Sequence, residues 1–256
     1  MINITKQIIR GILLIFCLCV FGAGALILEY ILWPSVRLFS KSDRDKKITY
    51  SKILQGSWIF FIGLMKFLRL IRIDSQDIEK LKSIKNSIIV CTHPSYIDIL
   101  ILISIIPQTT CFVAERLKNN IFFKNILKSL FIVEGQPVEQ WTSEAADILN
   151  DGFNLVVFPM GIRHRKNEFP KIRRGTALLA QKTHNDIAVV NMETNYDFMQ
   201  IHQPVYDVGS ETVVYSIKYR GIINVKEFLD RYPDDVTFKT ELSKYIAKTL
   251  YHDKKE

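Results

Sequence analysis

A histidine and an aspartate stand five residues apart directly after a short apolar run, in the stretch CTHPSYID at residues 91–98. An imidazole with a carboxylate partner can take a proton from a hydroxyl group near neutral pH. A positioned base of this kind is typically worth about 10² to 10⁴ in rate. The residue types therefore predict that His93 is a general base and that Asp98 fixes its tautomer.

The same stretch also has a purely structural interpretation. Ser95 and Asp98 fit the S-x-x-D pattern of a capping box, in which a carboxylate accepts from backbone N–H groups at the start of a helix. On this interpretation His93 is a polar loop residue. The two interpretations are compatible, because a carboxylate in the first helical turn can meet both a loop histidine and backbone donors.

A second stretch that could do chemistry runs over residues 154–180, NLVVFPMGIRHRKNEFPKIRRGTALLA. It indicates a strand, a Pro/Gly turn, a basic loop and a helix, and six of the twelve residues in 163–174 are Lys or Arg. Such a charge run is often only a solvated face. A basic loop after a strand, at the end where α/β sheets carry ligands, also suits a phosphate group.

Short β-rich runs alternate with helical stretches after residue 77. This alternation predicts an α/β domain over residues 77–256 with a mixed, largely parallel sheet flanked by helices. The expected strands lie at 87–92, 109–115, 130–135, 154–160, 186–192 and 212–222, and the expected helices at 96–106, 120–130, 142–150, 175–184 and 238–253.

The N-terminal part, residues 1–76, is expected to anchor the protein to a membrane. Residues 11–28 contain no charge and are long enough for a membrane span. The small residues at 23–25 leave a cleaved signal peptide as the alternative.

A second lipophilic segment at 53–73 carries Lys66, Arg69 and Arg72 at three-residue spacing, which predicts one basic stripe on a helix in the headgroup region. The two segments together indicate a hairpin or monotopic anchor, and a buried helix pair packed on the domain is the alternative.

Composition narrows the class of partner. The formal net charge is +8 with a pI near 9.2, and 48% of the residues are hydrophobic, so an anionic partner is expected. The uneven apolar content favours a phospholipid membrane, and no nucleic-acid-binding signature is present. The four cysteines have neither disulfide nor metal-ligand spacing, which indicates buried thiols in a reducing compartment.

Together the two motifs resemble those of the glycerolipid acyltransferases, which acylate lysophosphatidic acid and related lysophospholipids. HPSYID matches the family pattern H-x-x-x-x-D, and FPMGIR matches F-P-E-G-T-R at Phe158, Pro159, Gly161 and Arg163. FPKIRRGTALLA is similar to the family segment that follows. The resemblance covers about residues 85–192, with a looser similarity in the N-terminal helices.

The resemblance implies His93 as the catalytic base, Asp98 as its partner, and Ser95, Gly161 and Arg163 as substrate-binding residues, with Arg163 on the acceptor's phosphate. The expected reaction moves a fatty acyl group from acyl-CoA or acyl-carrier protein to a hydroxyl of a lysophospholipid-type acceptor, with no metal, cofactor or covalent acyl-enzyme. The expected location is the inner (cytoplasmic) membrane, with the catalytic domain facing the cytoplasm.

Four positions depart from the family pattern. Met160 stands where the family has a glutamate, and Ile162 where it has a threonine. Glu134 and Gly135 stand where a family motif carries an arginine, and Asn191 stands where the family has a proline. We expect these changes to alter the polar lining of the acceptor pocket while leaving the base and its partner. A catalytically degenerate lipid-binding membrane protein of the same fold is therefore the alternative function.

Overall fold

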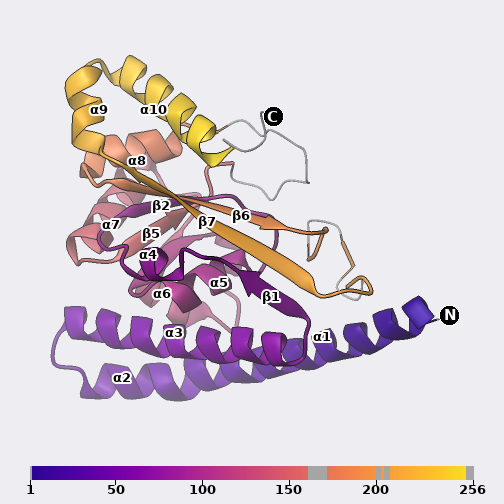
Figure 1. Ribbon diagram of the computed structural model, residues 1–256. Coiled ribbons are helices and arrows are strands. Elements are labelled where there is room, and N and C mark those ends of the chain that lie inside the picture. Colours follow the sequence, from indigo (N-terminus) through magenta and orange to yellow (C-terminus); the bar gives the residue numbers. More distant parts are fainter. Residues whose placement is uncertain (1, 161–171, 200–202, 205–207, 252–256) are drawn as a thin grey trace.

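The computed structural model describes residues 2–160, 172–199, 203–204 and 208–251 (Figure 1). Within them, seven strands form one sheet in the order β1-β7-β6-β2-β5-β3-β4. All neighbouring strands pair in parallel except β6 and β7, which are antiparallel. The predicted class, α/β with a mixed and largely parallel sheet, is confirmed. The strands are β1 (Ile71–Asp74), β2 (Ile88–Cys91), β3 (Thr109–Val113), β4 (Ile132–Val133), β5 (Asn154–Val157), β6 (Ile187–Thr194) and β7 (Val213–Ile223).

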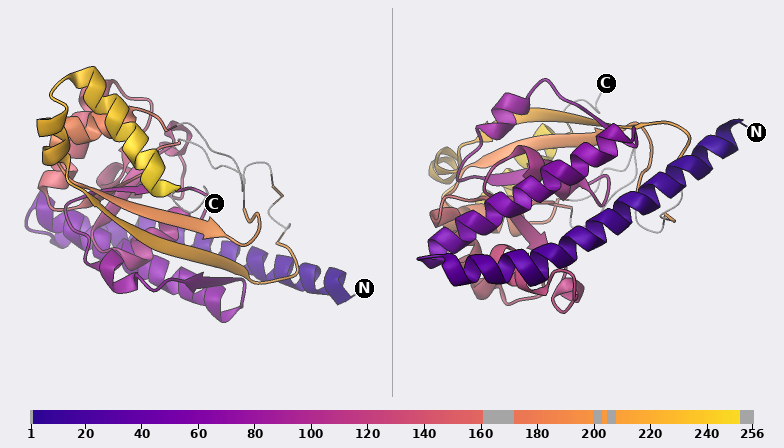
Figure 2. Two further views of the ribbon diagram at one scale, coloured as in Figure 1. Left: turned by 45° about the horizontal axis from the view of Figure 1, so that its top comes forward. Right: turned by 90° about the horizontal axis from the view of Figure 1, so that it is seen from below.

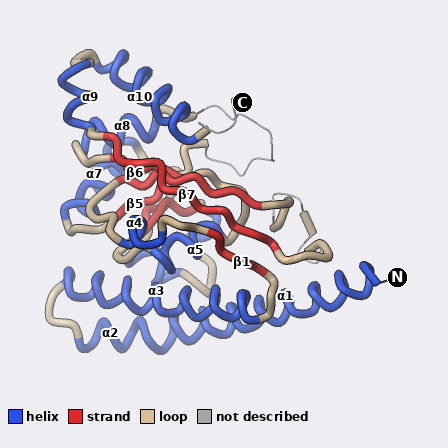
Figure 3. Tube along the Cα trace, viewed as in Figure 1, coloured by secondary structure: helices blue, strands red, loops and turns tan. Residues whose placement is uncertain are grey.

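Helices cover both faces of this sheet, as Figures 1 and 3 show. One face carries α1 (Ile2–Ile27), α3 (Asp43–Phe67) and α5 (Asp98–Ile105), which pack in an apolar cluster with alternate residues of the central strands such as Ile89. The other face carries α7 (Val138–Asn150), α8 (Gly175–Thr183), α9 (Val225–Arg231) and α10 (Asp235–Leu250), which pack on the intervening residues such as Val90. Because both faces are covered, every residue of β2 is buried.

The remaining helical elements are short. They are η1, a π-helical segment (Leu28–Leu32), α2 (Trp33–Phe39), α4 (Ile78–Lys82), η2 (Glu115–Leu117) and α6 (Lys124–Leu130). The expected helices at 96–106, 142–150, 175–184 and 238–253 are confirmed, whereas the expected strand at 130–135 is reduced to the two residues of β4. Strand β1 and helices α4 and α9 were not among the elements expected from the sequence.

Residues 2–67 form a long helical hairpin: α1, η1 and α2 run on as one rod, and α3 returns beside it. Figure 2 shows the two arms lying across one face of the domain, with the N-terminal end of α1 projecting beyond it. One stretch, Ile4–Phe39, is long and apolar enough to cross a membrane, and this is the candidate anchor. Among the described residues no second stretch of that kind is found.

Side chains tie this hairpin to the α/β domain at both ends. Arg10 donates to the backbone carbonyls of Arg69 and Leu70 at 2.9 and 3.2 Å. At the other end the buried carboxylate of Glu29, in η1, accepts from the backbone N–H groups of Asn125 and Ile126 at 2.7 and 3.1 Å. These are N-terminal donors of α6 that have no acceptor within their own helix.

The prediction of one helix with a basic stripe over residues 53–73 is wrong. The helix α3 ends at Phe67, and Arg69 adopts a left-handed conformation (φ 54°). The N–H groups of Arg69 and Leu70 bond to the carbonyls of Lys66 and Met65, which is a Schellman ending. Arg72 then lies in β1, which pairs with β7, so the end of the expected anchor segment belongs to the sheet.

Glu29→Ala is expected to lower the free energy of unfolding by about 1–3 kcal/mol, because two N–H groups of α6 lose their acceptor. Thermal unfolding in detergent measures the loss. Glu79→Ala is the control, since the Glu79 side chain is exposed and pairs with Lys82 on the surface. Equal melting temperatures for the two variants would contradict the capping role of Glu29.

Candidate active site

The two sequence motifs meet where neighbouring strands end. Strands β2 and β5 are parallel, with Val90 paired to Val157, so both end at the same edge of the sheet. His93 follows β2 and Phe158 follows β5, and their rings stack with centroids 4.0 Å apart and planes 17° apart. Parallel pairing therefore joins residues that lie 65 positions apart in the chain.

His93 and Asp98 form a direct pair. The Nδ1 atom of His93 lies 2.9 Å from Oδ2 of Asp98. Asp98 is fully buried, whereas 19% of the His93 side chain is exposed. A carboxylate only accepts, so Nδ1 carries the proton that it donates, and in the neutral ring Nε2 keeps its lone pair. This is the tautomer that a general base requires.

The carboxylate of Asp98 has two further donors, both from Ser95. The backbone N–H of Ser95 donates to Oδ2 at 2.8 Å, and the hydroxyl of Ser95 donates to Oδ1 at 2.5 Å. Asp98 is also the first residue of α5, where the helix dipole favours a negative charge. The pairing with His93 and the bond to a backbone donor thus coexist, as the sequence allowed.

The expectation that Ser95 contacts the substrate does not fit the structure. Ser95 is fully buried, and its hydroxyl lies between Asp98 and the phenol of Tyr215, 2.7 Å from the latter oxygen. Tyr215 was not expected at the site. It lies in a strand with ordinary alternation, 120 positions after Ser95, and no sequence pattern links the two residues.

A threonine fixes the turn that carries His93. The hydroxyl of Thr92 donates to the carbonyl of Met192 at 2.6 Å and accepts from the N–H of the same residue at 2.7 Å. Beside it, burial and the charge of Asp98 raise the pKa of the Cys91 thiol well above its usual value. Cys91 therefore stays protonated and is no nucleophile.

Gly161, Ile162 and Arg163 lie outside the described residues, as does most of the basic loop. Both ends of that loop are described. Pro159 follows Phe158, and its carbonyl accepts from the backbone N–H of Arg173 at 2.8 Å. The chain thus leaves the His93 edge and returns to the same point before α8 begins.

Two of the departures from the family pattern point away from an acceptor pocket. Met160 is buried in the core on the α10 side, where the hydroxyl of Tyr251 lies 2.7 Å from its sulfur. Asn191 is also buried, and its side-chain amide donates to the carbonyl of Leu250 at 3.0 Å. We expected these two changes to alter the polar lining of the acceptor pocket; in the structure both side chains contact the C-terminal end of α10.

A large apolar cavity of about 680 Å³ opens between the hairpin and the domain. Its lining comes from α1, η1, α3, α5, β3, η2 and α6 and includes Phe21, Trp58, Phe61, Ile99 and Val113. Ile99 follows Asp98 directly in α5, so one helix contributes to both the His93–Asp98 pair and the cavity. The sequence showed the apolar segments but not that they enclose a space.

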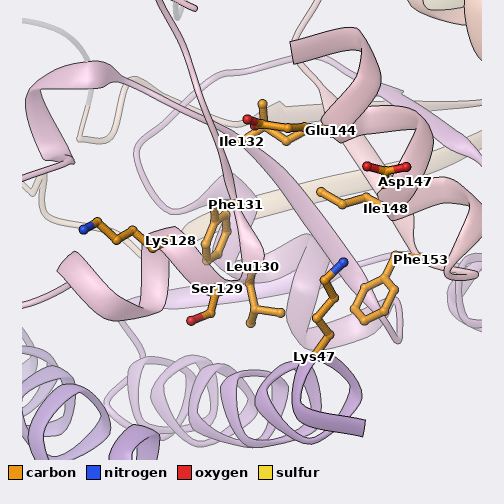
Figure 4. Close-up of a pocket in the computed structure, with 10 residues that line it drawn as sticks. All are labelled: Lys47, Lys128, Ser129, Leu130, Phe131, Ile132, Glu144, Asp147, Ile148 and Phe153. Atoms are coloured by element: carbon orange, nitrogen blue, oxygen red, sulfur yellow. The ribbon is translucent and has the colours of Figure 1, made fainter. Parts of the chain in front are cut away.

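A smaller pocket of about 170 Å³ lies between α3, α6 and α7 (Figure 4). Its lining has charges of both signs, from Lys47 and Lys128 and from Glu144 and Asp147. It also includes Phe153, which precedes β5, whereas the motif residues follow β5. This pocket is therefore at the other end of the strand from His93.

The chain belongs to the acyltransferase family, whose sequence pattern it matches over residues 72–211, more than half of its length. Its fold is similar to that in the crystal structure of the 1-acyl-sn-glycerophosphate (LPA) acyltransferase PlsC from Thermotoga maritima. The TM-score is 0.67, with 13% sequence identity over 98% of this chain and 99% of that one. A search of curated proteins by sequence found no match.

Phe158→Leu is expected to lower kcat of the acyl transfer roughly tenfold, because the His93 ring loses the flat surface that holds it in place. Steady-state kinetics measure the change. Phe112→Leu is the matched control, since Phe112 packs against Trp141 in the other apolar cluster. If both variants lower kcat equally, the stacking on His93 has no special role.

Proposed function

We propose that this protein transfers a fatty acyl group from an acyl thioester, carried by coenzyme A or by a carrier protein, to a hydroxyl of a lysophospholipid-type acceptor. The observation that carries the proposal is the pair of His93 and a fully buried Asp98 at the carboxyl edge of a parallel sheet, with no hydrogen bond to Nε2 from the residues that the structure describes. Membership of the acyltransferase family gives the general reaction class.

In the proposed mechanism Nε2 of His93 takes the proton of the acceptor hydroxyl. The oxygen attacks the thioester carbonyl carbon, the C–S bond breaks, and the proton passes from the imidazolium to the leaving thiolate. Asp98 stabilises the transient positive charge on the ring and keeps its orientation. No covalent acyl-enzyme, metal or cofactor is required by these steps.

The apolar cavity supports a fatty acyl chain as the group transferred. Its volume lies within the range of about 300–1,000 Å³ that small-molecule sites occupy. Its lining is almost entirely hydrocarbon and aromatic, which suits a chain without polar groups. Ile99, which follows Asp98 in α5, lines the cavity, and this supports a substrate position with the thioester carbonyl near His93 and the acyl chain in the cavity.

The acceptor proposed first is lysophosphatidic acid. Arg163 and the basic loop are the proposed phosphate ligands, and the bond from Arg173 to Pro159 supports a location of this loop next to His93. Met160 and Asn191 are buried among protein groups, so their departure from the family pattern is no argument against this acceptor.

We further propose that the hairpin lies along the cytoplasmic surface of the inner membrane and does not cross it. The stretch Ile4–Phe39 has 36 residues and is about 54 Å long, against a hydrocarbon core of about 30 Å. Arg10, near the start of the stretch, and Glu29, ten residues before Phe39, hold it to the domain. Exposed apolar residues on the outer side of the rod, such as Ile8, Ile12 and Phe16, would enter the lipid.

His93→Ala is expected to lower turnover by about 10² to 10⁴, because the general base is lost. The assay uses a labelled acyl thioester with a panel of lysolipids that differ in the headgroup. His184→Asn is the control, since His184 is exposed at the end of α8 in a left-handed conformation that asparagine tolerates. Full turnover by His93→Ala would refute the base, and an inactive wild type on every lysolipid would favour the lipid-binding alternative.

The membrane topology is tested with single cysteines at exposed charged positions near the two ends of the rod, Lys6→Cys and Lys41→Cys, in a background without other cysteines. An impermeant maleimide added to inside-out vesicles is expected to label both positions, because both ends lie on the cytoplasmic side. Labelling of one end only would show a crossing. N-terminal sequencing that finds residues 1–25 removed would show a signal peptide instead.

A further inference from the structure

The hydroxyl groups of Ser95 and Tyr215 connect the Asp98 carboxylate, through two hydrogen bonds, to strand β7. The hydroxyl of Ser95 lies 2.5 Å from Oδ1 of Asp98, and the phenol of Tyr215 lies 2.7 Å from the same serine oxygen. All three residues are fully buried. Neither hydroxyl has a part in the mechanism above.

The direction of these bonds follows from the number of protons. An ionised carboxylate only accepts, so the single hydroxyl proton of Ser95 points to Asp98. The serine oxygen is then left as an acceptor, and Tyr215 is the donor to it. Burial and the charge of Asp98 both raise the pKa of Tyr215 well above its usual value, so the phenol keeps the proton that it donates.

The sheet holds Tyr215 at this position. Because β7 is antiparallel to β6, the start of β7 lies at the edge where β6 ends, and Tyr215 is paired there with Thr194. On its other side it is paired with Ile73 of β1. A side chain on a strand that is paired on both sides, in a close-packed core, has little conformational freedom. The phenol oxygen of Tyr215 is therefore held in place and orients the rotatable hydroxyl of Ser95.

The consequence for Asp98 is that each carboxylate oxygen has its own donors. Oδ2 receives His93 and the backbone N–H of Ser95, and Oδ1 receives the Ser95 hydroxyl. A donor that itself accepts a hydrogen bond becomes a stronger donor. Tyr215 thus both orients the serine proton and strengthens the bond that fixes the carboxylate plane.

We propose that Tyr215 is a positioning residue, which acts through Ser95 to hold the Asp98 carboxylate in the orientation that keeps the His93 ring ready to accept a proton. No proton moves along this chain; its role is geometric and electrostatic. The proposal rests on the proposed function, since its effect is read in acyl transfer.

The test is a double-mutant cycle with Tyr215→Phe and Ser95→Ala in the full-length protein, assayed in detergent with a saturating acyl donor. Tyr215→Phe is expected to lower kcat roughly tenfold with KM changed less than about twofold, because substrate contacts are untouched. In the Ser95→Ala background the same change is expected to have no further effect on kcat, because the serine through which Tyr215 acts is absent.

Tyr50→Phe is the matched control. Tyr50 is a buried tyrosine of α3 whose hydroxyl donates to the carbonyl of Trp33 at 3.0 Å, away from the motif residues. It loses a buried hydrogen bond of the same kind and is expected to melt lower without a change in kcat. A purely structural Tyr215 would behave as Tyr50 does.

The outcomes separate the two proposals. If the wild type is active and Tyr215→Phe keeps its kcat, or lowers it by the same factor with and without Ser95, the positioning role is overturned. If the wild type is inactive with all donors and acceptors, the proposed function itself fails. Should Ser95→Ala not fold, the kcat and KM of Tyr215→Phe beside Tyr50→Phe decide the question.

Discussion

The buried carboxylate of Asp98 is the constraint on which the site depends. A charge removed from water is tolerated in a protein interior only when hydrogen-bond donors surround it. Here the donors are an imidazole, a backbone N–H and a hydroxyl, all within the turn of residues 93–98. The donors of the turn thus satisfy the carboxylate, and within the described part of the chain Nε2 of His93 is left without a hydrogen bond.

The sheet extends this local order to distant parts of the chain. Parallel pairing of β2 with β5 brings Phe158 onto the imidazole, and pairing of β2 with β6 brings Met192 to the hydroxyl of Thr92. The reversal at β7 brings Tyr215 to the same edge. The carboxyl edge of the sheet thus collects residues from four strands around one turn, as ligand sites in open α/β sheets do.

The helical hairpin and the C-terminal helix α10 pack on opposite faces of the sheet. The hairpin, held by Arg10 and Glu29, closes the apolar cavity beside α5. The end of α10 is held by Asn191 and lies against Met160, so two positions that differ from the family pattern interact with one helix end. Packing explains the residue types at positions 160 and 191. An apolar side chain and an amide suit a buried helix end, whereas a carboxylate there would need its own hydrogen-bond donors.

Features that depend on local order could be predicted from the residues alone. The alternation of β-rich and helical runs predicted the α/β class, the uncharged run predicted the candidate anchor, and the five-residue spacing of His93 and Asp98 predicted that the two side chains pair within one turn. Features that depend on the pairing of distant segments became visible only in the folded chain. The tertiary structure ended α3 before Arg69 because the next residues join β7, and it enclosed a cavity from segments that look merely apolar in the sequence. It also paired the Ser95 hydroxyl with Asp98 and Tyr215, because the hydrogen-bond partners of a buried hydroxyl depend on which strand packs against it.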